Sequence, residues 1–142
     1  MIIVLDTNVV VSGFLNAYGA PGEIVRLVAA GKICLAYDVR ILDEYVQVLS
    51  RPKFKIDHES IAAFIDQVRS DGILTTAMPL SIALKDPSDK MFLEVAAAAN
   101  VPYLVTGNMK HWKRICGMSS RGEGLENIAA TAKMANGRSL LK

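Results

Sequence analysis

The sequence lacks the features that mark secreted and membrane proteins. It has only two cysteines, Cys34 and Cys116, which lie far apart in no metal-ligand or redox spacing, so we expect reduced thiols and no disulfide framework. No apolar run approaches the length of about 18 residues that spans a bilayer. The apolar start of the chain is closed at once by Asp6, without a basic leader or cleavage site. These absences predict a cytoplasmic protein that is not inserted in a membrane.

The residues of several common enzyme sites are missing as well. The chain has no glycine-rich phosphate loop ending in Gly-Lys-Ser/Thr, no Gly-x-Gly-x-x-Gly and no Gly-x-Ser-x-Gly. Its only histidines, His58 and His111, have no partner at zinc-ligand spacing. The sequence therefore disfavours three functions: nucleotide binding by a phosphate loop, acyl transfer by a serine nucleophile, and zinc catalysis.

What the chain does have is enough apolar surface for one folded domain. It has 142 residues, of which 51% are hydrophobic and 21% charged, and we expect a single domain over residues 1–142. Its net charge of +2 is divided unevenly, because residues 1–107 hold nine basic and twelve acidic side chains, whereas residues 108–142 hold seven and two. The basic residues of 108–142 either attract a polyanion toward residues 1–107 or belong to a solvated tail. Within this segment, residues 127–142 form either a terminal helix or a frayed tail.

Short apolar strands alternate with amphipathic helices along the chain. The run at 2–5 is rich in β-branched residues and predicts a strand buried on both faces. Further strands are expected at 33–37, 73–76 and 103–105, and helices at 22–32, 38–50, 57–71 and 86–100. This alternation predicts an α/β fold, a central and mostly parallel β-sheet flanked by helices on both faces.

Polar clusters follow the first and the last of these strands. Asp6, Thr7 and Asn8 end the first, and Thr106 and Asn108 belong to the cluster that ends the last. In open parallel sheets ligands bind beyond the carboxyl ends of the strands, so both clusters are candidate sites. Asp6 follows four apolar residues directly, where a carboxylate needs a cation or hydrogen-bond donors. The alternative is that Asp6 only caps the following turn or helix.

Other carboxylates lie at the edges of predicted helices. Asp43 and Glu44 occupy opposite flanks of one apolar helix face, and the periodicity does not choose between them. Asp86 and Asp89 stand three residues apart at a helix start, where either can be the cap, and Glu94 lies at the flank of the same helix. An acidic cluster of this kind suits Mg²⁺ or Mn²⁺ and phosphodiester hydrolysis.

Four motifs follow one another in a characteristic order. They are 3–9 with Asp-Thr-Asn, 42–54 with Asp-Glu-Tyr and Arg-Pro-Lys-Phe, 86–94 with Asp-Pro-Ser-Asp, and 103–108. Together they resemble the PIN-domain nuclease family, and in particular its branch of VapC-like toxins from toxin–antitoxin pairs.

The resemblance implies a PIN-like fold and a Mg²⁺- or Mn²⁺-dependent endoribonuclease that hydrolyses RNA phosphodiesters. By this likeness Asp6, Glu44 and Asp89 are the catalytic metal ligands, and Glu44 is preferred over Asp43 on this ground alone. Asn8 and Thr106 would orient the carboxylates. The candidate supplementary metal ligands are Asn108, Asp86 and Glu94.

Asn108 departs from the family pattern, in which much of the family has aspartate. A neutral amide supplies less charge to a second metal, so the number of metals stays open, and the alternative function is a catalytically weak PIN module that binds RNA or a protein partner. The candidate contacts to the RNA backbone are Lys110, Lys113, Arg114 and Arg121. The resemblance further implies a cognate antitoxin protein and a homodimer.

Overall fold

The structure is a computed structural model that describes residues 1–79, 90–101 and 104–106. Within these residues the strands are β1 (Ile2–Leu5), β2 (Cys34–Tyr37), β3 (Ile73–Leu74) and β4 (Leu104–Val105). The helices are α1 (Thr7–Leu15), α2 (Ala20–Ala29), α3 (Val39–Leu49), α4 (His58–Asp71) and α5 (Lys90–Ala98), with a short 3-10 helix η1 (Pro52–Phe54).

The four strands form one parallel sheet in the order β3-β2-β1-β4. The chain winds outward from β1 through β2 to β3 and then returns to the other side of β1 to form β4. The winding therefore reverses between β1 and β4, and the carboxyl ends at such a switch point are where open α/β sheets bind ligands. The predicted α/β fold with a mostly parallel sheet is confirmed.

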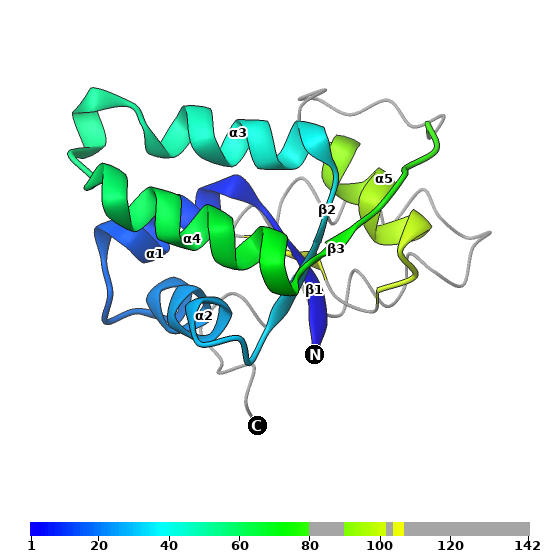
Figure 1. The fold of residues 1–142 in the computed structure, drawn as a ribbon, viewed down its shortest axis with the longest axis horizontal. Helices are drawn as coiled ribbons and strands as arrows, with labels where there is room; N and C mark the ends of the chain where they lie inside the picture. Colours follow the sequence, from blue (N-terminus) through cyan, green and yellow to red (C-terminus); the bar gives the residue numbers. More distant parts are fainter. Residues whose placement is uncertain (80–89, 102–103, 107–142) are drawn as a thin grey trace.

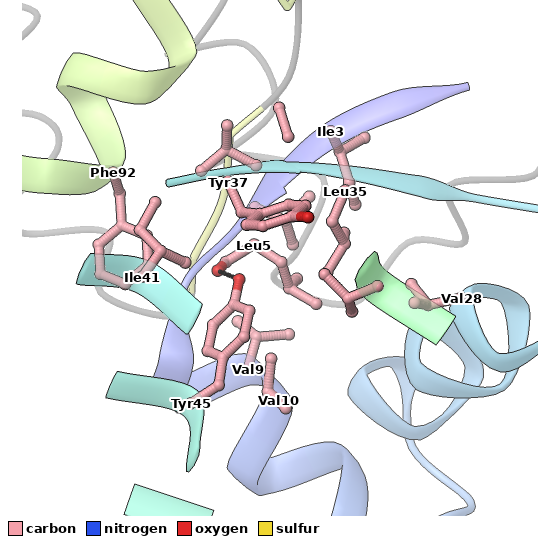
Figure 2. Close-up of a cluster of buried hydrophobic side chains, with 14 of the residues drawn as sticks. Ile3, Leu5, Val9, Val10, Val28, Leu35, Tyr37, Ile41, Tyr45 and Phe92 are labelled. Carbon is pink, nitrogen blue, oxygen red and sulfur yellow. Dashed lines mark hydrogen bonds between the residues drawn. The ribbon is translucent and has the colours of Figure 1, made fainter. Parts of the chain in front are cut away.

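The helices cover the sheet from two sides (Figure 1). Helix α5 packs on β1, β2 and β4, while α3 and α4 pack on β2 from the side where α1 and α2 also lie. Ile3, Val4 and Leu5 are all fully buried, as expected of a strand covered on both faces. Figure 2 shows the apolar cluster that gathers around this strand.

Aspartate caps start the two helices that the sequence predicted best. The Asp38 carboxylate accepts a hydrogen bond from the backbone N–H of Ile41 at 3.0 Å, and that of Asp57 from Ser60 at 3.3 Å. These caps place the starts of α3 and α4 within a residue of the predicted ones. Helix α4 buries one apolar face, formed by Ile61, Phe64, Ile65 and Val68.

The first helix is the main difference from expectation, because the sequence analysis predicted no helix over α1. Three successive valines, from Val9 to Val11, disfavour helix by propensity. All three are buried, and packing against α2 outweighs that preference. Helix α2 begins at Ala20, two residues earlier than expected, and the chain turns after it at Gly31 with φ +73°.

Two further segments differ in length from the prediction. Strand β3 holds two residues instead of four, and α5 ends at Ala98, with Asn100 left-handed at φ 52°. The predicted helix start at 86–89, Tyr103 and all residues from 107 onward lie outside the described residues, as does the predicted terminal helix or tail. Among the helices that are described, none combines the length and the apolar character needed to cross a bilayer.

Candidate metal site

Asp6 lies at the switch point, immediately after β1. It is 4% exposed, and it caps α1 by accepting a hydrogen bond from the backbone N–H of Asn8 at 3.4 Å. Its other carboxylate oxygen accepts from the hydroxyl of Thr106 at 2.7 Å. Thr106 is fully buried and follows β4, so it meets Asp6 because β1 and β4 pair in parallel up to Leu5 and Val105. Asp6 therefore does more than cap a helix, since it is also held from a segment 100 residues away.

Glu44 is turned toward the same place from the middle of α3. Its carboxylate accepts a hydrogen bond from the hydroxyl of Thr7, which is 4% exposed and belongs to the first turn of α1. Asp43 is exposed on the outer side of the helix. The structure thus distinguishes two neighbours that periodicity left equivalent, because only Glu44 contacts the residue that follows Asp6.

Two residues at this place were given no role of their own from the sequence. Thr7 belongs to the cluster predicted as a candidate site, but its hydroxyl was not expected to hold Glu44. Tyr45 was noted only as the residue after Glu44 in the Asp-Glu-Tyr motif. It is fully buried, and its hydroxyl donates to the backbone carbonyl of Leu5. Figure 2 shows its ring reaching from α3 toward Leu5, beside Val9 and Val10.

Tyr45 lies within the influence of both carboxylates. Burial raises the pKa of its hydroxyl well above the ordinary value, and the negative charges of Asp6 and Glu44 raise the pKa further. The phenol therefore stays protonated and remains a donor. Both carboxylates are therefore near enough to this one buried group for their charges to act on it.

Glu94 and Asn8 differ from their expected placement. Glu94 is buried, at 5% exposure, instead of lying at a helix flank, because α5 buries every residue from 91 to 96. Its carboxylate pairs with Arg40 at 3.0 Å, and the same guanidinium reaches Asp38 at 2.6 Å. The side chain of Asn8 is exposed, and the bond it makes to Asp6 comes from its backbone N–H.

The donor set of Asp6 and Glu44 fits a hard divalent cation. Both offer carboxylate oxygens, which Mg²⁺ and Mn²⁺ prefer, and hydroxyl donors orient both carboxylates. The described residues bring together no group of three or more His, Cys, Asp or Glu side chains that could hold a metal ion. The expected third ligand, Asp89, lies outside the described residues, as do Asp86, Asn108 and the four basic candidates for RNA contact.

A family profile for the PIN domain matches residues 2–110. The chain belongs to the PIN domain family. Comparison with curated proteins and with solved structures found no match. PIN domains are typically nucleases and generally use divalent metal ions, so a nuclease-type, hydrolytic function is supported for this PIN domain at the level of its family. The match includes Asp6, Glu44 and Thr106, and it ends at residue 110, at the start of the basic C-terminal segment.

Proposed function

We propose that this PIN domain is a Mg²⁺- or Mn²⁺-dependent endoribonuclease that hydrolyses RNA phosphodiesters. The observation that carries the proposal is the convergence of Asp6 and Glu44, which come from different elements, behind the carboxyl end of β1. Two carboxylates brought toward one place repel each other, and a cation between them relieves the repulsion. With Asp89 as the third ligand, they would hold the metal.

The residues of the chain position the reaction. Thr106 and the backbone N–H of Asn8 fix the two oxygens of Asp6, and Thr7 fixes one oxygen of Glu44. A bound divalent ion would supply the Lewis acid that makes water nucleophilic near neutral pH and neutralises charge developing on the phosphate. Water would be the nucleophile, so the chain would need neither a nucleophilic side chain nor a covalent intermediate.

The basic C-terminal segment supplies the proposed contacts to the RNA backbone. Seven of the last 35 residues are basic and two are acidic, which favours a polyanion next to an acidic body. The residues proposed for these contacts are Lys110, Lys113, Arg114 and Arg121. Binding through phosphates should weaken steeply as salt is raised and should carry no base sequence information.

The test is cleavage of end-labelled single-stranded RNA in Mg²⁺ or Mn²⁺, with EDTA and heat-denatured protein run beside the wild type. The decisive variant is Asp6→Asn, because asparagine keeps the helix cap but removes the charge. Asp57→Asn is the matched control, since Asp57 also caps a helix but is exposed at the start of α4. Cleavage that EDTA and Asp6→Asn abolish, and that Asp57→Asn leaves intact, is the expected result. Equal cleavage by Asp6→Asn would contradict the proposed site.

A second candidate function rests on Asn108, where much of the family has aspartate. In this case the protein is a catalytically weak PIN module that binds RNA or a protein partner. It would bind RNA in a salt-dependent way without cleaving it in the assay above. Asn108→Asp should then raise Mg²⁺-dependent cleavage. If the variant cleaves no faster than the wild type, the missing negative charge at residue 108 is not the reason for weak activity.

We further propose that the protein is the toxin of a toxin–antitoxin pair, acting in the cytoplasm as a homodimer with a cognate antitoxin that covers the acidic site. This proposal is supported by the order of the four motifs and by their likeness to VapC-like toxins. Induced expression of the wild type should arrest growth and expression of Asp6→Asn should not. If neither protein affects growth, the toxin role is contradicted. The nuclease proposal is tested separately by the cleavage assay and does not depend on this result.

A further inference from the structure

Two hydroxyl groups tie the segment around Asp6 to helix α3. The hydroxyl of Tyr45 donates to the carbonyl of Leu5, and the hydroxyl of Thr7 donates to the carboxylate of Glu44. Leu5 and Thr7 are the chain neighbours of Asp6, so the ties lie on both sides of it. Tyr45 is the chain neighbour of Glu44. The two candidate ligands are therefore held between two cross-links.

The hydrogen bond from Tyr45 reaches β1 at the end of the strand where β1 no longer pairs with β2. Strand β1 pairs with β2 through Ile2 and Ile3, and with β4 through Val4 and Leu5. At the end of the strand, the backbone N–H of Asp6 donates to Val105 of β4 at 3.0 Å. The Leu5 carbonyl accepts a hydrogen bond from the hydroxyl of Tyr45. Because Tyr45 belongs to α3, this hydrogen bond links the end of β1 to the helix that carries Glu44.

The ring of Tyr45 is itself fixed by aromatic packing. Its centroid lies 6.3 Å from that of Phe64 in α4, and Phe64 meets Phe14 of α1 edge-on at 5.4 Å. Edge-to-face contacts of this kind hold both the position and the tilt of a ring. The hydroxyl therefore projects from a ring of α3 that packs on Phe64 of α4, which in turn packs on Phe14 of α1.

We propose that Tyr45 is a positioning residue, whose hydroxyl sets the separation of the Asp6 and Glu44 carboxylates and thereby the affinity of the site for a divalent cation. This inference rests on the proposed function, because it assigns the site a metal. It concerns an interaction that involves neither carboxylate directly, and residues that orient ligands without touching the metal commonly change its affinity.

The experiment measures the dissociation constant of Mn²⁺ by calorimetry, and the spectrum of bound Mn²⁺ by electron paramagnetic resonance, on the full chain. Tyr45→Phe removes the hydroxyl and keeps the ring that packs on Phe64. We expect Mn²⁺ affinity to fall about tenfold, with a changed spectrum of the ion that still binds. Replacing Tyr45 with 4-aminophenylalanine keeps a weaker donor at the same point and should give an affinity between those of the phenylalanine variant and the wild type.

Two controls separate positioning from general loss of stability. Tyr37→Phe alters another buried tyrosine, on β2, and should leave Mn²⁺ affinity unchanged. Val28→Ala opens a cavity in α2 and should lower the melting temperature without changing Mn²⁺ affinity. If Val28→Ala weakens Mn²⁺ binding as much as Tyr45→Phe does, the effect is general and the inference is overturned.

The outcomes distinguish this inference from the proposed function. A wild type that binds Mn²⁺ together with a folded Tyr45→Phe of equal affinity overturns the role of Tyr45 alone. A wild type that binds no Mn²⁺ contradicts the proposed metal site, and the inference with it. If Tyr45→Phe does not fold, the 4-aminophenylalanine variant decides, because affinity equal to that of the wild type would overturn the inference.

Discussion

Thr106→Val is the perturbation whose effect can be worked most directly from the structure. Valine has nearly the shape of threonine and suits a fully buried position after a strand, so the change removes little except the hydroxyl. That hydroxyl donates to the Asp6 carboxylate at 2.7 Å, and a hydrogen bond to a charged group contributes about 1.5 to 3 kcal/mol. We expect the free energy of unfolding to fall by about 2 kcal/mol, which lowers the melting temperature of a domain this size by about 8 °C.

Urea denaturation and calorimetry of the metal-free protein measure this loss. Thr75→Val is the matched control, because the Thr75 hydroxyl bonds only weakly, at 3.3 Å, to a backbone carbonyl at an exposed site. This control should change the free energy of unfolding by less than about 0.5 kcal/mol. Equal stability of Thr106→Val and the wild type would refute the view that Thr106 holds a buried, charged Asp6.

Three further predictions concern neighbouring parts of the fold. Because burial and the two carboxylates raise the pKa of Tyr45, the unfolded chain loses this proton near pH 10 while the folded chain keeps it. The free energy of unfolding should therefore fall above that pH by up to about 1.4 kcal/mol per unit, and urea titrations of Tyr45→Phe should lack this part of the slope. Arg40→Ala removes an ion-pair partner of buried Glu94. Since Arg40 is half exposed, we expect the free energy of unfolding, measured by urea denaturation, to fall by about 1 to 2 kcal/mol. An unchanged urea midpoint would contradict a stabilising role of the ion pair. Gly22→Ala would place a Cβ 2.7 Å from the Cα of Ala17 and should cost about 1 to 3 kcal/mol by calorimetry, whereas a stability gain would show that the loop gives way.

Local patterns in the sequence were enough to predict most of the sheet and the well-capped helices. The apolar run of β1 and the caps Asp38 and Asp57 are strong signals, because each depends only on residues nearby in the chain. The neighbouring strand ends also followed from the topology rule for parallel sheets. Helix α1 was missed since its three valines favour a strand locally, and their burial in the core depends on residues far away in the chain.

The directions and partners of the side chains at the candidate site were harder to predict from the sequence. The preference for Glu44 over Asp43 came from the family resemblance, while the direction of each side chain depends on how α3 is rotated against α1. Tyr45 looked like an ordinary core residue, because periodicity reports burial and says nothing about a hydroxyl at the far end of the ring. The pairing of Glu94 with Arg40 joins residues 54 positions apart, and no local pattern indicates it.

The central claim is that Asp6 and Glu44, at the carboxyl end of β1, support metal-dependent cleavage of RNA. It is tested most directly by comparing Glu44→Gln with Asp43→Asn in Mn²⁺-dependent cleavage of single-stranded RNA. The two residues are adjacent on one helix, and each change removes one negative charge, but only Glu44 contacts Thr7, the residue that follows Asp6. The account predicts that Glu44→Gln lowers the cleavage rate by about a hundredfold or more, while Asp43→Asn stays within about twofold of the wild type. Equal rates for the two variants would contradict it.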